Sequence, residues 1–202
     1  MSDSQASSSA AVDQPNKRQQ RRRYRELRRA LTPQAQLQAS LGLARNARSY
    51  RQLFNLERVL AYAPIAGEID PGVLLTNLKA QVYLPRIVNY RTGSMQFFRA
   101  AGIQRRNQLG IMEPDNTREM LPARHLDAVL LPLVAFSRDG NRLGMGGGFY
   151  DRAFEFRLRF SSSTRPLLIG VAHHFQQAER LAHDPWDVPL DAIITDRELI
   201  RF

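Results

Sequence analysis

The chain has 202 residues, of which 43 % are hydrophobic and 24 % charged, and it carries a net charge of +10. This length and composition are typical of a globular domain and exclude an intrinsically disordered chain. The absence of cysteine excludes disulfides, cysteine-bearing zinc sites, iron–sulfur clusters and thiol nucleophiles. The longest apolar run, 128–136, is interrupted by a proline, so we expect no membrane span.

The N-terminal residues 1–16 are small, polar and unpatterned, which predicts a disordered tail. We expect one folded domain over residues 17–202. The first residues lack the apolar centre of a secretory signal, so a cytoplasmic protein is expected, and we take it to be a monomer.

Most of the positive charge lies in one predicted helix, residues 17–29, which holds eight basic residues and one acid. Tyr24, Leu27 and Leu31 recur at helical spacing and predict a narrow apolar stripe. The basic residues can bind nucleic acid or another anion, or they can form a solvated helix face. Charge alone leaves both interpretations open.

A second helix is predicted after Thr32 and Pro33, an N-cap residue and a first-turn proline. Its expected buried face carries Leu37, Leu41 and Ala44. Further along the chain, predicted helices alternate with predicted strands. The expected strands are 59–65, 81–88, 95–99, 127–136, 167–172 and 191–195, and the expected helices are 73–80 and 149–160.

This alternation predicts an α/β fold, in which strand–helix–strand units build a largely parallel sheet. The segment 127–136 is the most apolar and suits a central strand that is covered on both faces.

A polar, then glycine-rich loop follows that strand, and four of its residues 144–148 are glycine. Glycines let backbone N–H groups approach an anion closely, and a strand, a glycine loop and a helix in succession is an arrangement that binds phosphate. The Walker pattern is excluded because Phe149, and not lysine, follows the last glycine. The dinucleotide pattern G-x-G-x-x-G also fails at Phe149. A flexible surface loop is the alternative interpretation.

The segment 142–152 (RLGMGGGFYDR) resembles the signature of the 5-formyltetrahydrofolate cyclo-ligase family, also called 5,10-methenyltetrahydrofolate synthetases. Shorter pieces resemble the family in the same order along the chain. They are 67–70 (GEID), 83–85 (YLP), 111–114 (IMEP), 132–136 (PLVAF) and 186–190 (WDVPL).

The resemblance implies a three-layer αβα fold with a mostly parallel sheet, similar to sugar-phosphate isomerases and CoA transferases. It implies ATP-dependent conversion of 5-formyltetrahydrofolate to 5,10-methenyltetrahydrofolate, with release of ADP and phosphate. In this reaction the formyl oxygen is phosphorylated and N10 then closes the ring. ATP and Mg²⁺ are the implied cofactors, and a reduced folate is the implied partner.

The resemblance also implies site residues. Lys17 and Arg142 match catalytic positions. The implied ATP contacts are Lys17, Arg18, Arg21, Arg142, Leu143, Gly144, Met145, Gly146, Gly147, Gly148, Phe149 and Tyr150. The implied folate contacts are Arg21, Ala63, Glu68 and the loop residues from Met145 to Phe149. Asp151 and Asp187 match the magnesium ligands.

Each of these residues also has a purely structural interpretation. Glu68 precedes the turn sequence Asp-Pro-Gly, and an Asp at position 151 could simply cap a helix. The sequence departs from the family at Gln20, where leucine is usual, and extra arginines follow. A nucleic-acid-binding protein that uses residues 17–29 on a repurposed fold is therefore the alternative function. The four histidines show no metal-binding spacing and are assigned no role.

Overall fold

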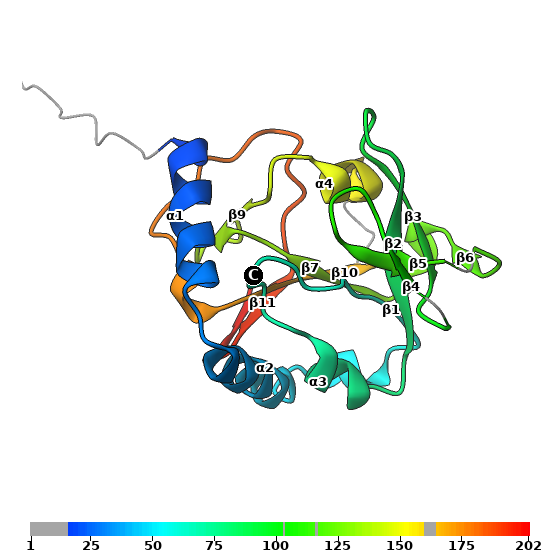
Figure 1. Cartoon of the computed structure of the whole chain (residues 1–202), viewed down its shortest axis with the longest axis horizontal. Helices are drawn as coiled ribbons and strands as arrows, with labels where there is room; N and C mark the ends of the chain where they lie inside the picture. The colour runs from blue at the N-terminus through cyan, green and yellow to red at the C-terminus, as the bar shows by residue number, and fades with distance from the viewer. Residues whose placement is uncertain (1–15, 103, 116, 160–164) are drawn as a thin grey trace, which may run out of the picture.

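The structure, a computed structural model, describes residues 16–102, 104–115, 117–159 and 165–202. Its centre is an eight-stranded sheet in the order β12-β11-β10-β7-β1-β2-β3-β6 (Figure 1). The five parallel strands are β11 (Ala192–Thr195), β10 (Leu167–Ala172), β7 (Ala128–Pro132), β1 (Arg58–Leu60) and β2 (Gln81–Asn89). The strands added antiparallel at the two edges are β12 (Leu199–Arg201), β3 (Ser94–Arg99) and β6 (Met120–Leu121).

Two short ribbons and eight helical segments complete the described fold. The ribbons pair β4 (Gln104–Arg106) with β5 (Met112–Pro114), and β8 (Ala135–Phe136) with β9 (Arg142–Leu143). The α-helices are α1 (Lys17–Arg29), α2 (Pro33–Ala47), α3 (Gly72–Thr76), α4 (Phe149–Phe154) and α5 (Phe156–Arg159). The short 3-10 helices are η1 (Arg51–Asn55), η2 (Ala123–His125) and η3 (His174–Gln176).

The central strands are buried on both faces, as the apolar run predicts. In β7, Leu130 belongs to the apolar cluster that includes residues of α2 and α3. Its neighbour Leu131 belongs to the opposite cluster, which includes Phe154 of α4. Successive residues of a strand point to opposite faces, so one strand supplies both clusters. The predicted α/β fold, with a mostly parallel sheet between helices, is confirmed (Figure 1).

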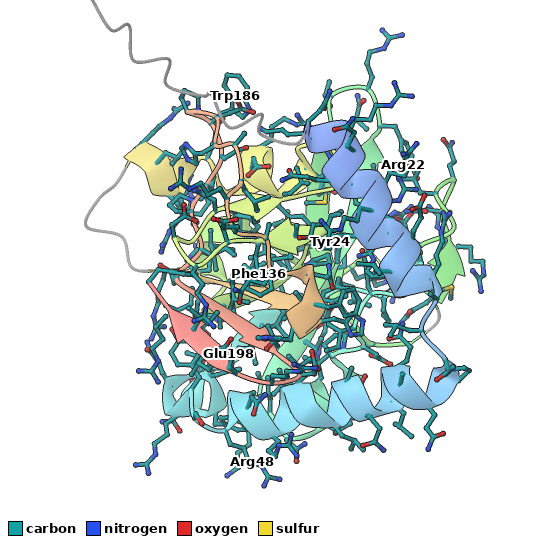
Figure 2. The ribbon with its side chains drawn as sticks, turned by 90° about the vertical axis from the view of Figure 1, so that its left-hand side faces the viewer. Arg22, Tyr24, Arg48, Phe136, Trp186 and Glu198 are labelled. Carbon is teal, nitrogen blue, oxygen red and sulfur yellow. The ribbon has the colours of Figure 1, made fainter. Side chains whose placement is uncertain are left out.

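Helix α1 has the predicted bounds but a different buried stripe. The buried residues are Gln20, Tyr24 and Arg28, while Leu27 is 43 % exposed. Figure 2 shows Tyr24 on the inner side of α1 and Arg22 on the outer side. The prediction that Leu27 shares the stripe with Tyr24 is therefore wrong, because the helix is rotated toward polar partners.

The predicted buried face of helix α2 is confirmed for Ala44 but not for its two leucines. Its Thr32 cap is confirmed, since the Thr32 hydroxyl accepts a hydrogen bond from the Ala35 N–H at 3.2 Å. Leu37 and Leu41 are exposed, however, and small residues such as Gly42 are buried. A Cβ on Gly42 would lie 2.4 Å from the Asp196 backbone oxygen. This close approach requires glycine at position 42, while Leu43 supplies the large buried side chain of the helix.

The segments around the glycine loop differ from the prediction. The predicted strand 127–136 leaves the sheet after Pro132 and continues as β8, outside the central sheet. The expected loop contains the short strand β9, and the expected strand 59–65 is a strand only to Leu60. The predicted tail lies outside the described residues except for Asn16, which caps α1 through its side chain. Within the described ranges, no helix is long and apolar enough to cross a membrane.

Candidate functional site

A large cleft of about 1140 Å³ opens at the carboxyl ends of β1 and β7. Residues that follow β1, including Tyr62 and Glu68, form part of its wall, and the loop that follows β9 crosses it. The carboxyl ends of parallel strands are where open α/β sheets bind ligands, because the loops leaving neighbouring strands converge there. This cleft is the candidate site.

The cleft gathers the predicted site residues from distant parts of the chain. The predicted residues that line it are Lys17, Arg21, Ala63, Glu68, Arg142, Leu143, Gly144, Met145, Gly146, Gly147, Gly148, Phe149, Tyr150, Asp151 and Asp187. Arg18 does not line it and is an exposed residue on α1. Every predicted position except Arg18 therefore lies at the cleft, and the roles of these residues remain predictions.

Helix α1 presents a row of positive charge to the cleft, formed by Lys17, Arg21 and Arg25. These residues are four positions apart, so they lie on one face of the helix. The Lys17 ammonium lies 2.5 Å from an Asp184 carboxylate oxygen and 3.9 Å from Asp187. The Arg21 Nε donates a hydrogen bond to the Gly144 carbonyl at 2.9 Å, which fastens α1 to the glycine loop.

The glycine loop needs its glycines for two different reasons. Gly146 and Gly148 have φ values of +102° and +61°, which side-chain-bearing residues rarely adopt. Gly147 has an ordinary φ, but a Cβ there would lie 2.5 Å from the Phe149 ring. Glycine at these positions therefore shapes the loop and leaves room for the Phe149 ring beside the cleft.

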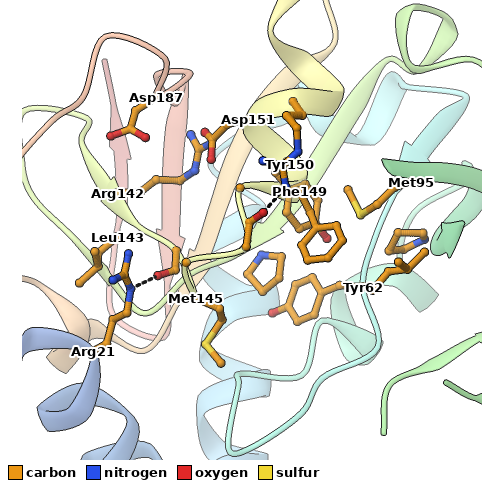
Figure 3. A pocket seen from close by; sticks show the side chains of 18 of the residues that line it. Arg21, Tyr62, Met95, Arg142, Leu143, Met145, Phe149, Tyr150, Asp151 and Asp187 are labelled. Carbon is orange, nitrogen blue, oxygen red and sulfur yellow. Dashed lines mark hydrogen bonds and ion pairs between the residues drawn. The ribbon is translucent and has the colours of Figure 1, made fainter. Parts of the chain in front are cut away.

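Arg142 lies among acidic groups at one end of the cleft, between Asp187 and Asp151 (Figure 3). Its guanidinium pairs with the Asp151 carboxylate and donates to the Val188 carbonyl. Burial lowers the pKa of Arg142, while Asp151 and Asp187 oppose this effect. An arginine remains charged under these conditions, so this end of the cleft keeps a fixed cation.

The opposite end of the cleft is aromatic and contains a buried carboxylate. Tyr62, Phe149 and Tyr150 gather there (Figure 3). Glu68 lies in the same wall, is 9 % exposed, and accepts a hydrogen bond from the Ile65 N–H at 3.1 Å. Burial raises the pKa of Glu68, and nearby Arg28 opposes that rise. This end can receive a flat polar ring that carries N–H donors.

A model of the 5-formyltetrahydrofolate cyclo-ligase family matches residues 13–196. The chain belongs to this family. It is 36 % identical over 177 residues to the 5-formyltetrahydrofolate cyclo-ligase of Escherichia coli K12, covering 85 % of this chain and 95 % of the relative. Identity to the cyclo-ligase of Haemophilus influenzae is 37 % over 185 residues, covering 88 % and 97 %.

Solved structures agree with the cyclo-ligase assignment. The 5,10-methenyltetrahydrofolate synthetase of Aquifex aeolicus superposes with a TM-score of 0.77 at 29 % identity, covering 92 % of each chain. The synthetase of Mycoplasma pneumoniae has a TM-score of 0.67 at 24 % identity, covering 90 % of this chain and 99 % of that one, and at this identity it shows the fold alone. The chain is therefore an enzyme, a ligase with 5-formyltetrahydrofolate cyclo-ligase activity.

The alternative function, nucleic-acid binding through residues 17–29, finds no support in these comparisons. The fold explains much of the basic helix in another way. Lys17, Arg21 and Arg25 face the cyclo-ligase cleft, and Arg28 is buried.

Several cleft residues of this cyclo-ligase were missed from the sequence. Arg25 could have been found, because it continues the four-residue spacing of Lys17 and Arg21. Tyr62 directly precedes the predicted residue Ala63, so its position near the end of the predicted strand could have indicated that it lines the cleft. Met95 and Asp184 come from β3 and from a loop far along the chain, and only tertiary structure brings them to the cleft.

The donor set for magnesium in the cyclo-ligase cleft is small. No cluster of three or more acidic, histidine or cysteine side chains that could hold a metal occurs within the residues described. Asp151 uses Oδ1 for its contacts with Arg142 and Val188, and Asp187 uses Oδ2 to accept from the Asp184 N–H. Two carboxylates with phosphate oxygens and water suit Mg²⁺, which seldom needs an all-protein cage. The residues present therefore fit a magnesium ion that arrives with a nucleotide.

Proposed function

We propose that this cleft binds 5-formyltetrahydrofolate and MgATP side by side and activates the formyl oxygen by phosphorylation. The observation that carries the proposal is the division of one cleft into an ionic end and an aromatic end (Figure 3). Its volume, about 1140 Å³, is above the range of about 300–1000 Å³ that single small ligands usually occupy. The space suits two substrates that must meet.

The proposed chemistry turns a poor leaving group into a good one. The formyl oxygen attacks the γ-phosphorus of ATP, an O–P bond forms, and the bond from the γ-phosphorus to ADP breaks. N10 of the folate then attacks the formyl carbon, loses its proton, and the C–O bond breaks with release of phosphate. The protein must hold the two reactants in line and neutralise the charge that develops on the phosphoryl group.

The ionic end suits the triphosphate. Lys17 already pairs with carboxylate oxygens of Asp184 and Asp187. A phosphate oxygen can take the place of one of these carboxylates as the anionic partner of Lys17. Arg21 lies against the glycine loop, whose backbone can approach phosphate closely. We assign Lys17 and Arg142 to the neutralisation of phosphoryl charge, and we add Arg25 to the cationic row.

The aromatic end suits the pterin. The Glu68 carboxylate is an acceptor in a largely apolar wall, and a pterin presents adjacent N–H donors to such a group. Phe149 lies at this end with Tyr62 and Tyr150 in Figure 3, where its ring would border the proposed folate. Ala63 adds a small side chain to the same wall.

Magnesium would be held by Asp151 and Asp187 together with the phosphates. When bound, it would neutralise triphosphate charge and orient the transferred group. Arg142 would hold Asp151 in place from the inner side of the cleft.

The test is a direct assay with purified protein. 5-Formyltetrahydrofolate and MgATP should give a rise in the near-ultraviolet absorbance of the conjugated methenyl product. Omission of ATP, or chelation of Mg²⁺, should abolish the rise, and one ADP should form for each methenyl group. Product formation without ATP consumption would contradict the phosphorylation step, while ATP hydrolysis without product would contradict the assignment of the folate end.

A further inference from the structure

One arginine of α1 is buried immediately beside Glu68. The Arg28 side chain has 0 % exposure, and its Nη1 lies 3.5 Å from Glu68 Oε1 and 3.3 Å from the Leu133 carbonyl oxygen. Its Nε and Nη2 are buried and have no hydrogen-bond partner within the described part of the chain. Arg28 does not line the cleft, whereas Glu68 does.

A fully buried arginine is unusual because its guanidinium cannot be neutralised by losing a proton. Such a charge is retained where it has a specific counter-charge, and Glu68 is the acidic group that acts on Arg28. The contacts of Arg28 leave much of its hydrogen-bonding capacity unused. A contribution to stability therefore explains poorly why an arginine occupies position 28, since an apolar side chain of similar volume is often at least as stabilising.

The backbone next to Glu68 is built against the same arginine. Gly67 has a φ of +76°, and a Cβ there would lie 2.5 Å from the Arg28 carbonyl oxygen. The Gly67 carbonyl is contacted at 3.1 Å by the Gln36 amide and at 3.1 Å by His173 Nε2. The close approach places the turn that carries Glu68 against the last turn of α1, and the two contacts tie this turn to α2 and to the residue after β10.

We propose that Arg28 is a positioning residue for the folate, which holds the Glu68 carboxylate charged and fixed from behind the cleft wall without touching the substrate. This inference rests on the proposed role of Glu68 as the pterin acceptor. It gives the final turn of α1 a function distinct from that of the cationic row at its start.

The charges around Glu68 make Arg28 the group that matters. The titratable and charged groups that interact with Glu68 or Arg28 are Arg25, Tyr62, Tyr150 and His173, and Asp70 acts on Tyr62. Burial raises the pKa of Tyr62 and of Tyr150, so both stay neutral near pH 7. Burial lowers the pKa of His173, which favours its neutral form. Arg25 acts on Arg28 with a like charge, and Arg28 is the counter-charge that acts on Glu68.

The experiment compares Arg28→Met with Arg29→Met, which makes the same chemical change at the next, exposed position of α1. We expect Arg28→Met to raise the KM for 5-formyltetrahydrofolate by about tenfold or more at pH 7, because a buried carboxylate without its counter-charge favours the protonated form. The KM for ATP should change by less than about twofold, and Arg29→Met should change neither constant by more than that.

A pH profile separates this role from general loosening of the fold. Without Arg28, Glu68 should ionise only at higher pH, so the folate KM of Arg28→Met should fall as the pH is raised from 7 to 9. The Arg29→Met enzyme should show the profile of the unmodified enzyme. A folate KM for Arg28→Met that is raised equally at every pH would overturn the proposal.

The variants Glu68→Gln and Arg28→Met/Glu68→Gln complete the test, and thermal unfolding reports whether each is folded. The double variant leaves neither Arg28 nor Glu68 as an unpaired buried charge. If Arg28→Met alone unfolds, comparing the double variant with Glu68→Gln still tests whether Arg28 acts through Glu68. If Arg28 acts through Glu68, adding Arg28→Met to the Glu68→Gln variant should change its folate KM by less than about twofold. Multiplicative effects of the two changes would refute that coupling. An unchanged folate KM in Glu68→Gln would instead refute the proposed role of Glu68 itself.

Discussion

Replacing Gly67 by alanine should strongly destabilise the enzyme, because a Cβ has no space there. The new atom would lie 2.5 Å from the Arg28 carbonyl oxygen and 2.8 Å from its carbonyl carbon, both backbone atoms of α1. Backbone cannot rotate away as a long side chain can. The φ of +76° adds the strain that an alanine meets in left-handed conformation.

The expected size follows from these two effects. Left-handed backbone costs an L-residue about 1–2 kcal/mol, and overpacking typically costs about 1–3 kcal/mol more. Reduced freedom of the unfolded chain returns about 0.4–1 kcal/mol. The free energy of unfolding should therefore fall by about 1–5 kcal/mol. For a chain of this length that corresponds to a drop in Tm of about 2–20 °C.

Differential scanning calorimetry on Gly67→Ala and Gly102→Ala tests the reasoning. Gly102 has a φ of +85°, but no atom of the residues that the structure describes lies within 4 Å of the Cβ position, so its substitution carries the backbone strain without the collision. We expect Gly102→Ala to cost about 1 kcal/mol or less. Equal Tm values for the two variants would show that the contact between the Gly67 turn and α1 is not a tight one.

Two further predictions concern charged groups. Lys17→Met should raise the KM for ATP by about tenfold or more, whereas Arg18→Met, outside the cleft, should change it by less than about twofold; steady-state kinetics decides. Burial opposes ionisation of Asp127, but hydrogen bonds from Arg58 and Glu57 outweigh burial and lower its pKa. Its stabilisation is present above about pH 4 and is lost as the pH falls through the lower folded pKa, so Asp127→Asn should lower Tm at pH 7 and flatten the acid dependence of Tm. If Asp127→Asn left the dependence of Tm on pH in acid unchanged, the proposed stabilisation by ionised Asp127 would be contradicted.

The class of fold could be predicted because apolar runs and turn residues alternate clearly along the chain. The faces of the helices could not. Leu37 and Leu41 have the spacing of a buried face, yet α2 turns Gly42 and Leu43 inward, and Gly42 lies against the Asp196 backbone. Close helix packing selects for small volume, and a hydrophobicity pattern does not record volume.

The part of the site that is one continuous segment could be predicted from the sequence. The residues that only folding brings to the site could not. The loop from Arg142 to Asp151 lines the cleft as the family resemblance implies. Arg28 could not be recognised, because one arginine among eight basic residues in α1 gives no sign of being buried. Asp184 is likewise an ordinary loop acid until folding brings it within 2.5 Å of Lys17.

Helix α1 meets the cleft with Lys17, Arg21 and Arg25 and reaches behind its wall with Arg28. It thus touches the proposed nucleotide end and supports the proposed folate end as one rigid rod. If binding of one substrate displaced α1, the affinity of the cleft for the other substrate would change. Thermodynamic linkage then requires that the factor by which ATP alters folate affinity equals the factor by which folate alters ATP affinity. The factor by which each substrate alters the affinity for the other would be the same whichever substrate binds first.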